Sequence, residues 1–510
     1  MKVNLYNTES IMSTSSSTAL NNHWLNFIDG QWQDSQQHTL VKDPATDQVF
    51  ASIACADSSD VDRAVTAAKN CVESGVLTKC RPAVRAQLLL KIAIEIRNIA
   101  DQAAPLLVQE NGKTLNDARD EFLIAARYFE YYGGIADKIE GTSIPLGEDY
   151  VDFTYYEPLG VCAQIVPWNF PVDICARSLA PALAAGNAVV IKSPELTPLA
   201  MTWLVTACQR AGVPKGAVNM INGVGHEAGA ALVAHPDVNH IVFTGSVATG
   251  KSILRSAADR AVPCVMELGG KSAAVVFADA DLEQFLDSVQ WGIFFNAGQV
   301  CSAMSRILVH RDIYPQVVER VASLAKSLQV GAGMQNAQLT PLVSDIQQQR
   351  VLGCCEKAVS EGATLVTGGK AITELVDPTT KAPQATQGYF VQPTVFADVS
   401  TQMAIFNEEV FGPVVTISAF DSEEEAWALA NGTDFGLVAG VFTKDLSRAM
   451  RASRALKAGQ IFVNEWYAGG IETPFGGVGQ SGYGREKGQE ALYSYVQTKN
   501  VAIRVNLSGE

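Results

Sequence analysis

Three short stretches of the chain place a reactive side chain at an abrupt turn between apolar runs. In IVPWNFP, two prolines rigidify the backbone around Asn169, whose amide could donate a hydrogen bond to an oxyanion. In VMELGGKS, Glu267 ends an apolar run before two glycines and could act as a general base. In FFNAGQVCSAMSR, Cys301 follows a glycine-containing turn and could act as a nucleophile once deprotonated. Each also has a plainer interpretation: a turn asparagine, a surface glutamate and an inert cysteine.

A fourth stretch, FTGSVATGKS, suggests two kinds of phosphate site. Residues 245–252 match the phosphate-loop consensus, and Asp279 after the apolar run AAVVF could hold the Mg²⁺ that a triphosphatase needs. Alternatively, a strand that turns into a helix at Gly245 and Ser246 could bind the pyrophosphate of a dinucleotide. The triphosphatase hypothesis leaves the first three stretches unexplained, which favours the dinucleotide.

The elements that would position these residues alternate between strand and helix. Residues 61–132 have helical periodicity, and residues 140–159 resemble two extended strands with a turn between them. From Gly160 the apolar runs VCAQIVPW, NAVVIKSP, AVNMING and HIVFTG are separated by helical segments, which predicts a parallel sheet of the dinucleotide-binding kind. A second series, from SAAVVFAD through SRILVH, TLVTGG, YFVQPTVF and VVTISAF to QIFVNE, predicts a second α/β domain.

Composition excludes several classes of partner. The 510 residues include 38 Lys and Arg against 53 Asp and Glu, a net charge of −15, and contain no dense basic run, which argues against nucleic acid. No apolar stretch reaches about 18 residues, and residues 1–22 lack the features of a signal peptide, so we expect a cytoplasmic protein with a flexible leader and no membrane partner. Ten scattered cysteines and six histidines show no ligand spacing, so we expect no metal site.

The reactive stretches and their order resemble the aldehyde dehydrogenase superfamily from about residue 23 to about residue 505. The matching pieces are PWNFP, IKSPELTP, FTGSVATG, MELGGKS, NAGQVC, NEEVFGPV and PFGGVGQSGYGRE. The resemblance implies an α/β fold with a Rossmann-type NAD-binding domain (23–139 and 160–268), an α/β catalytic domain (269–474) and a small β oligomerisation arm (140–159 and 487–510). It also implies a homodimer or homotetramer with a tunnel for a small-molecule aldehyde.

The resemblance assigns a role to each reactive residue. Cys301 would attack the aldehyde, and Asn169 with the Cys301 backbone N–H would hold the oxyanion. Glu267 would activate the water that hydrolyses the thioester, giving an acid and not a coenzyme A ester, and Glu486 in GYGRE would relay protons to Glu267. Either Glu267 or cofactor binding could deprotonate the thiol.

The resemblance also identifies residues for the cofactor and the substrate. A carboxylate at Glu195 would accept bonds from the ribose hydroxyls and repel a 2′-phosphate, which favours NAD⁺ over NADP⁺. Arg177 matches a tunnel arginine that binds the substrate carboxylate in succinate-semialdehyde dehydrogenases, while Phe295 stands where that subgroup has a second arginine and Gly469 near its anchor-loop serine. We therefore expect a carboxylated or substituted semialdehyde, with a neutral aromatic or aliphatic aldehyde as the alternative and an ion pair as the other role for Arg177. The expected cofactor contacts are Trp168, Lys192, Glu195, Gly229, Gly245, Ser246, Glu409 and Phe411.

Overall fold

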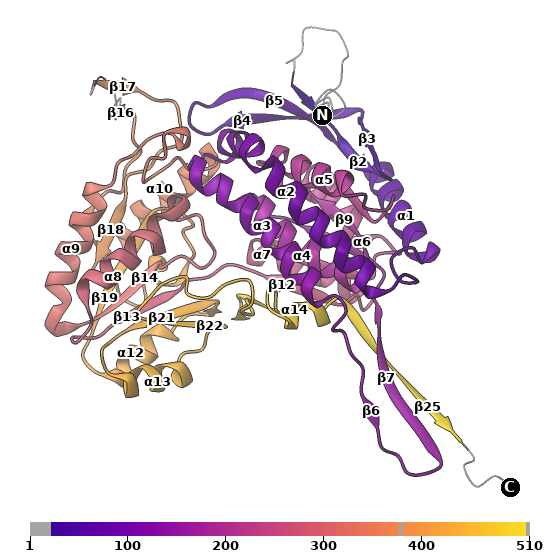
Figure 1. Cartoon of the computed structure of the whole chain (residues 1–510). Helices are drawn as coiled ribbons and strands as arrows, with labels where there is room; N and C mark the ends of the chain where they lie inside the picture. The colour runs from indigo at the N-terminus through magenta and orange to yellow at the C-terminus, as the bar shows by residue number, and fades with distance from the viewer. Residues whose placement is uncertain (1–21, 377–379, 381, 506–510) are drawn as a thin grey trace.

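Two α/β lobes lie side by side, and a β arm projects from one of them (Figure 1). The computed structural model describes residues 22–505 except 377–379 and 381. The predicted leader, residues 1–22, lies outside the described residues but for its last one. The predicted α/β fold is confirmed.

The first lobe is built on an eight-stranded sheet with the order β24-β12-β11-β8-β9-β10-β2-β3. Its five middle strands are parallel, and antiparallel strands lie at both edges. The four predicted apolar runs form four of the middle strands, because fully buried parallel strands read as continuous apolar segments. The strands are β2 (Asn26–Ile28), β3 (Gln31–Gln33), β8 (Val161–Ile165), β9 (Ala188–Lys192), β10 (Val218–Ile221), β11 (His240–Thr244), β12 (Cys264–Glu267) and β24 (Gly482–Tyr483).

Helices cover this sheet and form a further layer in front of it (Figure 1). Helix α1 packs on β9 and β10, whereas α2 and α3 pack on α4 and α5. The first helix begins at a capping box in which Asp57 and Asp60 satisfy each other's backbone N–H groups. The helices are α1 (Ser58–Ser74), α2 (Pro82–Asn111), α3 (Leu115–Ile135), α4 (Pro171–Ala185), α5 (Leu199–Arg210), α6 (Ala230–Ala234) and α7 (Val247–Ala258).

The second lobe is built on a seven-stranded sheet with the order β15-β18-β19-β14-β13-β21-β22. All its strands are parallel except the edge strand β15. Its strands are β13 (Ala273–Val276), β14 (Arg306–His310), β15 (Thr364–Thr367), β18 (Thr394–Ala397), β19 (Val414–Phe420), β21 (Val438–Phe442) and β22 (Gln460–Val463). Its helices are α8 (Leu282–Val289), α9 (Tyr314–Ser327), α10 (Asp345–Ser360), α11 (Ala404–Asn407), α12 (Glu423–Ala430) and α13 (Leu446–Ala455).

Each lobe has its own apolar core. The first core runs along the chain to Leu268 and the second begins at Ala273, so the predicted boundary at 268/269 falls between them. The first core also includes Ile471, Ala491, Leu492 and Tyr495 near the C-terminus. Strand β21 is absent from the sequence prediction, because the glycine within VAGVF weakens the strand pattern. The domain limits themselves stay a prediction.

The arm is a three-stranded antiparallel sheet made from two distant segments. Strand β7 (Tyr150–Pro158) pairs with β6 (Ser143–Ile144) on one side and with β25 (Val496–Arg504) on the other. Within the predicted arm segment, 487–510, α14 (Glu490–Tyr493) packs on α4, and Leu492 and Tyr495 belong to the first core. A further sheet of β1 (His23–Trp24), β5 (Gln48–Cys55) and β4 (Gln37–Asp43) lies on the outside of the first lobe.

Candidate active site

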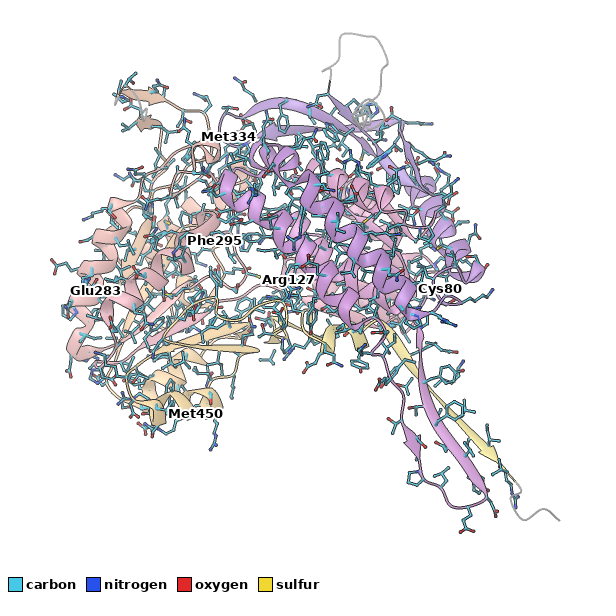
Figure 2. The ribbon with its side chains drawn as sticks, in the orientation of Figure 1. Cys80, Arg127, Glu283, Phe295, Met334 and Met450 are labelled. Atoms are coloured by element: carbon cyan, nitrogen blue, oxygen red, sulfur yellow. The ribbon has the colours of Figure 1, made fainter. Side chains whose placement is uncertain are left out.

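A cavity of about 430 Å³ lies between the lobes and is lined by residues of both. From the first lobe it receives Asn169 and Arg177, and from the second Phe295, Cys301 and Tyr467. Phe295 lies where the two lobes meet (Figure 2). The structure therefore brings four of the predicted site residues, Asn169, Arg177, Phe295 and Cys301, onto one surface.

A strained turn presents Cys301 to this cavity. Asn296 and Ala297 have positive φ angles of 48° and 55°, a conformation that non-glycine residues rarely adopt. At Gly298, φ is 72° and a Cβ atom would lie 2.1 Å from the Gly412 carbonyl oxygen, so only glycine fits. Burial raises the pKa of the Cys301 thiol to about 12, although the nearby Arg177 lowers it. The thiol thus needs a base or a bound cofactor to become a nucleophile.

Asn169 is held in place from both sides of its turn. Its carbonyl oxygen accepts a hydrogen bond of 2.9 Å from Lys113 Nζ, which is ion-paired with Glu121. Its side-chain Nδ2 donates to the Gln299 carbonyl oxygen at 3.0 Å, two residues before the thiol. The amide donor is therefore fixed beside the Cys301 turn, as an oxyanion site requires. Lys113 and Glu121 had no sequence signal beyond their place in a helical region.

Glu267 ends strand β12 with its carboxylate buried. Among the described residues neither of its side-chain oxygens has a hydrogen-bond partner. Burial raises its pKa, Arg177 and Arg485 lower it, and Glu486 raises it further. One oxygen lies so close to Gly476 in PFGG that a Cβ there would be 2.7 Å from it. A carboxylate with free oxygens and a raised pKa suits a general base near neutral pH.

Arg177, on α4, lies near the carboxylates of Glu267 and Glu486. It forms a buried ion pair with Glu486, whose other carboxylate oxygen accepts a hydrogen bond from the Ser178 hydroxyl. Arg177 Nη2 also donates to Thr244 Oγ1 at 3.3 Å. Two roles are predicted for Arg177, binding of a substrate carboxylate and a structural ion pair, and the structure contains the ion pair. The Glu486 carboxylate compensates the positive charge of Arg177 that a substrate carboxylate would need.

The predicted adenosine-ribose residues lie at the end of β9, where Lys192 is the last residue of the strand and Glu195 follows it. Lys192 Nζ lies 3.4 Å from Glu195 Oε1, and the Gly225 backbone N–H donates to the same oxygen. A Cβ at Gly225 would lie 3.0 Å from Glu195 Oε1, so this glycine keeps the approach open. Gly225 is absent from the predicted set, which names Gly229 at the other end of the same turn, where no atom would meet an added Cβ within 4 Å.

The predicted nicotinamide residues lie in the second lobe. Glu409 accepts a hydrogen bond of 3.0 Å from the Gly270 N–H, and burial raises the pKa of Glu409 to about 7. Phe411, with a φ of 60°, meets Trp168 of the first lobe edge to face at 5.4 Å between ring centroids. The predicted cofactor residues thus come from both lobes, as a cleft-bound dinucleotide requires.

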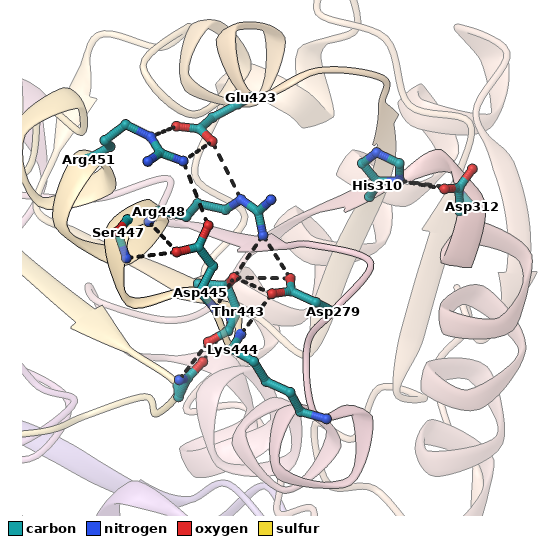
Figure 3. A network of polar contacts seen from close by, with 11 residues as sticks. Asp279, His310, Asp312, Glu423, Thr443, Lys444, Asp445, Ser447, Arg448 and Arg451 are labelled. Carbon is teal, nitrogen blue, oxygen red and sulfur yellow. Dashed lines mark hydrogen bonds and ion pairs between the residues drawn. The ribbon is translucent and has the colours of Figure 1, made fainter.

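The triphosphatase hypothesis is wrong. Helix α7 begins at Val247 with Ser246 as its N-cap, so Lys251 and Ser252 lie within the helix and outside any loop that could cradle phosphates. Lys251 is exposed and lies 3.4 Å from Gln480 Oε1. Asp279 follows β13 in the other sheet, where Thr443, Lys444 and Arg448 bind its carboxylate (Figure 3). Only Gly245 and Ser246, at the strand-to-helix turn, keep a place at the expected pyrophosphate site.

Several cavity residues are missing from the sequence prediction. Asp117, Asp120 and Asp173 carry carboxylates to the lining, and the three-residue spacing in LNDARDEF was the only signal for the first two. Asp117 and Asp120 share one face of α3 because residues three apart are helical neighbours. Asp173 Oδ1 is buried and has no partner among the described groups. The lining on this side is therefore acidic.

One histidine cluster lies apart from this cavity. His23 Nε2 and His38 Nε2 lie 2.9 and 3.1 Å from Asp34 Oδ1 on the outer sheet, so the sequence separation of 15 positions concealed a possible metal-ligand grouping. None of its residues lines the cavity. No helix in the described part of the chain has the length and apolar character to cross a bilayer.

Two α/β lobes with a thiol and acid–base side chains at their junction have the arrangement of an enzyme active site between lobes. The model of the aldehyde dehydrogenase family matches residues 32–501, and the chain belongs to that family. It is 38% identical over 486 residues to the peroxisomal aminoaldehyde dehydrogenase 1 of Pisum sativum, covering 93% of this chain and 94% of the relative.

Solved structures give the same result. An NAD⁺ complex of aldehyde dehydrogenase from Bacillus cereus superposes with a TM-score of 0.92 at 39% identity, over 96% of this chain and 98% of the other. A betaine aldehyde dehydrogenase from Staphylococcus aureus in complex with NAD⁺ has a TM-score of 0.90 at 34% identity, over 94% and 95% of the two chains. The predicted family is confirmed, and NAD as the cofactor is confirmed at the level of the family.

Proposed function

We propose that this protein oxidises an aldehyde to a carboxylic acid with NAD⁺ through a covalent intermediate on Cys301. The observation that carries the proposal is that a cavity-facing thiol and a fixed amide donor meet at the lobe junction, with the buried Glu267 carboxylate near the thiol but outside the cavity lining. Glu267 is close enough to the Cys301 thiol to raise its pKa, so the two groups act within one site.

The chain's own residues provide each covalent step. The Cys301 thiolate attacks the carbonyl carbon, a C–S bond forms, and the oxyanion is stabilised by Asn169 Nδ2 and the Cys301 backbone N–H. NAD⁺, when bound, would supply the hydride acceptor that this carbon needs for the adduct to collapse to a thioester. Glu267 then takes a proton from water as the water oxygen attacks the thioester carbon, and cleavage of the C–S bond releases the acid and restores the thiolate.

The residues present fit the dinucleotide. The N–H groups at the start of α7 and its dipole suit a pyrophosphate, and the half-exposed Glu195 can accept bonds from ribose hydroxyls. Glu409 has the free carboxylate oxygen that a nicotinamide ribose would bind, since only one oxygen has a hydrogen bond from a described residue. Lys192 would bind the adenosine ribose beside Glu195.

Two substitutions test the reaction. Cys301→Ala should abolish NADH formation from any aldehyde, and retained turnover would remove Cys301 as the nucleophile. Glu267→Gln should keep one burst of NADH per active site and lose steady turnover by a factor of about 10²–10⁴, the usual contribution of a general base. Loss of the burst as well would assign Glu267 to an earlier step. Rapid-mixing absorbance at the NADH band measures both phases.

For the substrate, we propose an aldehyde with a positively charged amino or quaternary ammonium group at its far end. Asp117, Asp120 and Asp173 line the cavity together with one further cation, Lys487, whereas the charge of Arg177 is compensated by Glu486. Aromatic rings that can face a cation, including Tyr128 and Tyr467, line the same space. The relatives named for aminoaldehyde and betaine aldehyde support this class.

A panel of matched aldehydes tests this choice against the carboxylated semialdehyde predicted from Arg177. The panel consists of three aldehydes of equal chain length: an ω-aminoaldehyde, a neutral aliphatic aldehyde and a semialdehyde. We expect the highest kcat/KM for the cation and a selective rise of its KM in Asp120→Asn, with the neutral aldehyde unaffected. A higher kcat/KM for the semialdehyde would restore the original hypothesis.

The arm supports the proposal of a homodimer or homotetramer. Val151, Phe153, Tyr155 and Ile503 on its strands are large hydrophobic residues that are 37–49% exposed in the single chain. A projecting sheet with such residues suits burial against another copy. Light scattering after gel filtration should give a dimer or tetramer mass, and a double change Phe153→Glu with Ile503→Glu should lower it. The cytoplasmic location stays a proposal that cell fractionation can test.

A further inference from the structure

Arg177 is the cation at the centre of the titrating groups of the site. Its guanidinium pairs with Glu486, lies over the Phe475 ring at 5.3 Å from the centroid and donates to Thr244 Oγ1. Thr244 and Glu267 are the last residues of neighbouring strands and are register partners. The hydrogen bond to Thr244 therefore positions the guanidinium at the strand end that carries Glu267.

The two carboxylates beside Arg177 are satisfied to very different degrees. Glu486 Oε2 is in the ion pair with Arg177 without a hydrogen bond, and its other oxygen accepts a hydrogen bond from Ser178. The Glu267 oxygens have no partner among the described groups, and Arg177 Nε is likewise unpartnered. Glu486 is thus fixed by its contacts, whereas Glu267 remains available to a water molecule and depends on the surrounding charge for its protonation state.

We propose that Arg177 is a positioning residue for the hydrolytic half of the reaction, anchored by Glu486 and Thr244 so that its charge keeps Glu267 able to accept a proton. This inference rests on the proposed function, because it concerns the step in which Glu267 acts. Arg177 then has no direct role in binding the aldehyde. The substrate's distal group is recognised elsewhere in the cavity.

The other charged groups around the pair are consistent with this assignment. Arg485 also faces Glu267 and lowers its pKa less than Arg177 does, while Glu486 raises it. Around Arg177 itself lie Tyr128 from α3, Asp173 from α4 and Lys487 from the segment after β24. Burial raises the pKa of Glu267 and is the larger effect, so loss of the Arg177 charge should move it still higher.

Single-turnover measurements with enzyme in excess over a neutral aldehyde such as propanal separate the two halves of the reaction. NADH absorbance reports hydride transfer, and acid quench reports release of the product. In Arg177→Met, we expect the rate of acid release at pH 7 to fall by about tenfold. The pH at which this rate rises should increase by about one unit, because one pKa unit is a tenfold change in the ionised fraction. Hydride transfer should fall less, and Arg177→Lys should recover most of the lost rate.

A matched control separates this role from a structural one. Arg85 is also a buried arginine of the first lobe, but it donates to the Leu77 and Ala184 carbonyl oxygens and lies beside the Cys80 thiol. Arg85→Met should change stability without moving the pH dependence of acid release. Should Arg177→Met fail to fold, Glu486→Gln tests the same inference with the opposite expected shift. This change removes a negative charge near Glu267, so the rate of acid release should rise at a lower pH than in the wild-type enzyme.

The outcomes distinguish this inference from the proposed function. An unchanged pH dependence in both Arg177→Met and Glu486→Gln would overturn it, and so would a loss confined to carboxylated aldehydes. In either case, a Cys301-dependent burst in the wild-type enzyme would leave the proposed oxidation intact. If Cys301→Ala kept the activity, the proposed function itself would be wrong.

Discussion

Two buried ion pairs meet helix α4, and they differ in how completely their polar atoms are satisfied. In the Lys113–Glu121 pair, the ammonium contacts Glu121, the Asn169 carbonyl oxygen and the Phe170 ring, and Glu121 accepts the N–H groups of Val172 and Asp173 at the start of the helix. In the Arg177–Glu486 pair, Arg177 Nε and the neighbouring Glu267 carboxylate have no partners among the described residues.

The difference separates a scaffold from a responsive site. A buried pair whose atoms are all engaged fixes the geometry around it, because any movement leaves a charge without a partner. A buried cluster with free oxygens responds to a proton or a water molecule, because the low dielectric makes each added charge matter. We infer that the first pair holds the Asn169 turn and that the second sets the chemistry.

We expect the largest effect when the scaffold pair, Lys113 and Glu121, is broken. Lys113→Met leaves Glu121 buried without its cation, and removing one partner of such a pair typically costs about 3–5 kcal/mol of unfolding free energy. Urea denaturation measures this. The control is Arg97→Met, which breaks an exposed pair with Glu130 and should cost less than about 1 kcal/mol. Equal costs would remove the distinction between the two kinds of pair.

The next effect tests what the scaffold positions. Asn169→Ala removes the side-chain donor while its backbone carbonyl can keep the bond to Lys113. Loss of one oxyanion donor typically lowers the rate by about 10²–10³-fold, or about 2.7–4 kcal/mol. Single-turnover NADH formation should show this loss with little change in unfolding free energy. A normal rate of hydride transfer would remove Asn169 from the oxyanion site.

A smaller effect concerns a pair with one exposed end, Lys192 and Glu195. Glu195 is 45% exposed, so a change there should alter ligand choice more than stability. In Glu195→Ser, loss of the carboxylate removes its repulsion of a 2′-phosphate, and the NAD⁺ over NADP⁺ ratio of kcat/KM should narrow by about tenfold, or about 1.4 kcal/mol. An unchanged ratio would exclude Glu195 from the choice of cofactor.

The smallest effect is expected at an exposed charge whose one side-chain contact among the described residues is with Gln480. Lys251 lies on the exposed face of α7, so Lys251→Ala should change the unfolding free energy by no more than about 0.5 kcal/mol. The rate of aldehyde oxidation should also stay unchanged. A large loss of either would show that this end of the phosphate-loop match has a role after all.

The sequence by itself determined the fold and singled out the candidate reactive residues. Buried parallel strands require continuous apolar runs, so ten of the fifteen strands in the two main sheets were visible as runs such as NAVVIKSP and SAAVVFAD. Cys301, Glu267 and Asn169 stood out because chemistry needs their side chains at turns next to glycine or proline. The match at residues 245–252 misled because a consensus of residue types does not show where the helix begins.

Only the tertiary structure decided which charges face each other. Arg177 and Glu486 are 309 positions apart, and nothing in either local pattern shows that the arginine already has an anionic partner. The acidic lining by Asp117 and Asp173, the approach of Gly225 to Glu195 and the scaffold pair below Asn169 likewise come from different elements. Local patterns report the period of a strand or helix, whereas the protonation and selectivity of a site depend on groups that folding brings together from distant parts of the chain.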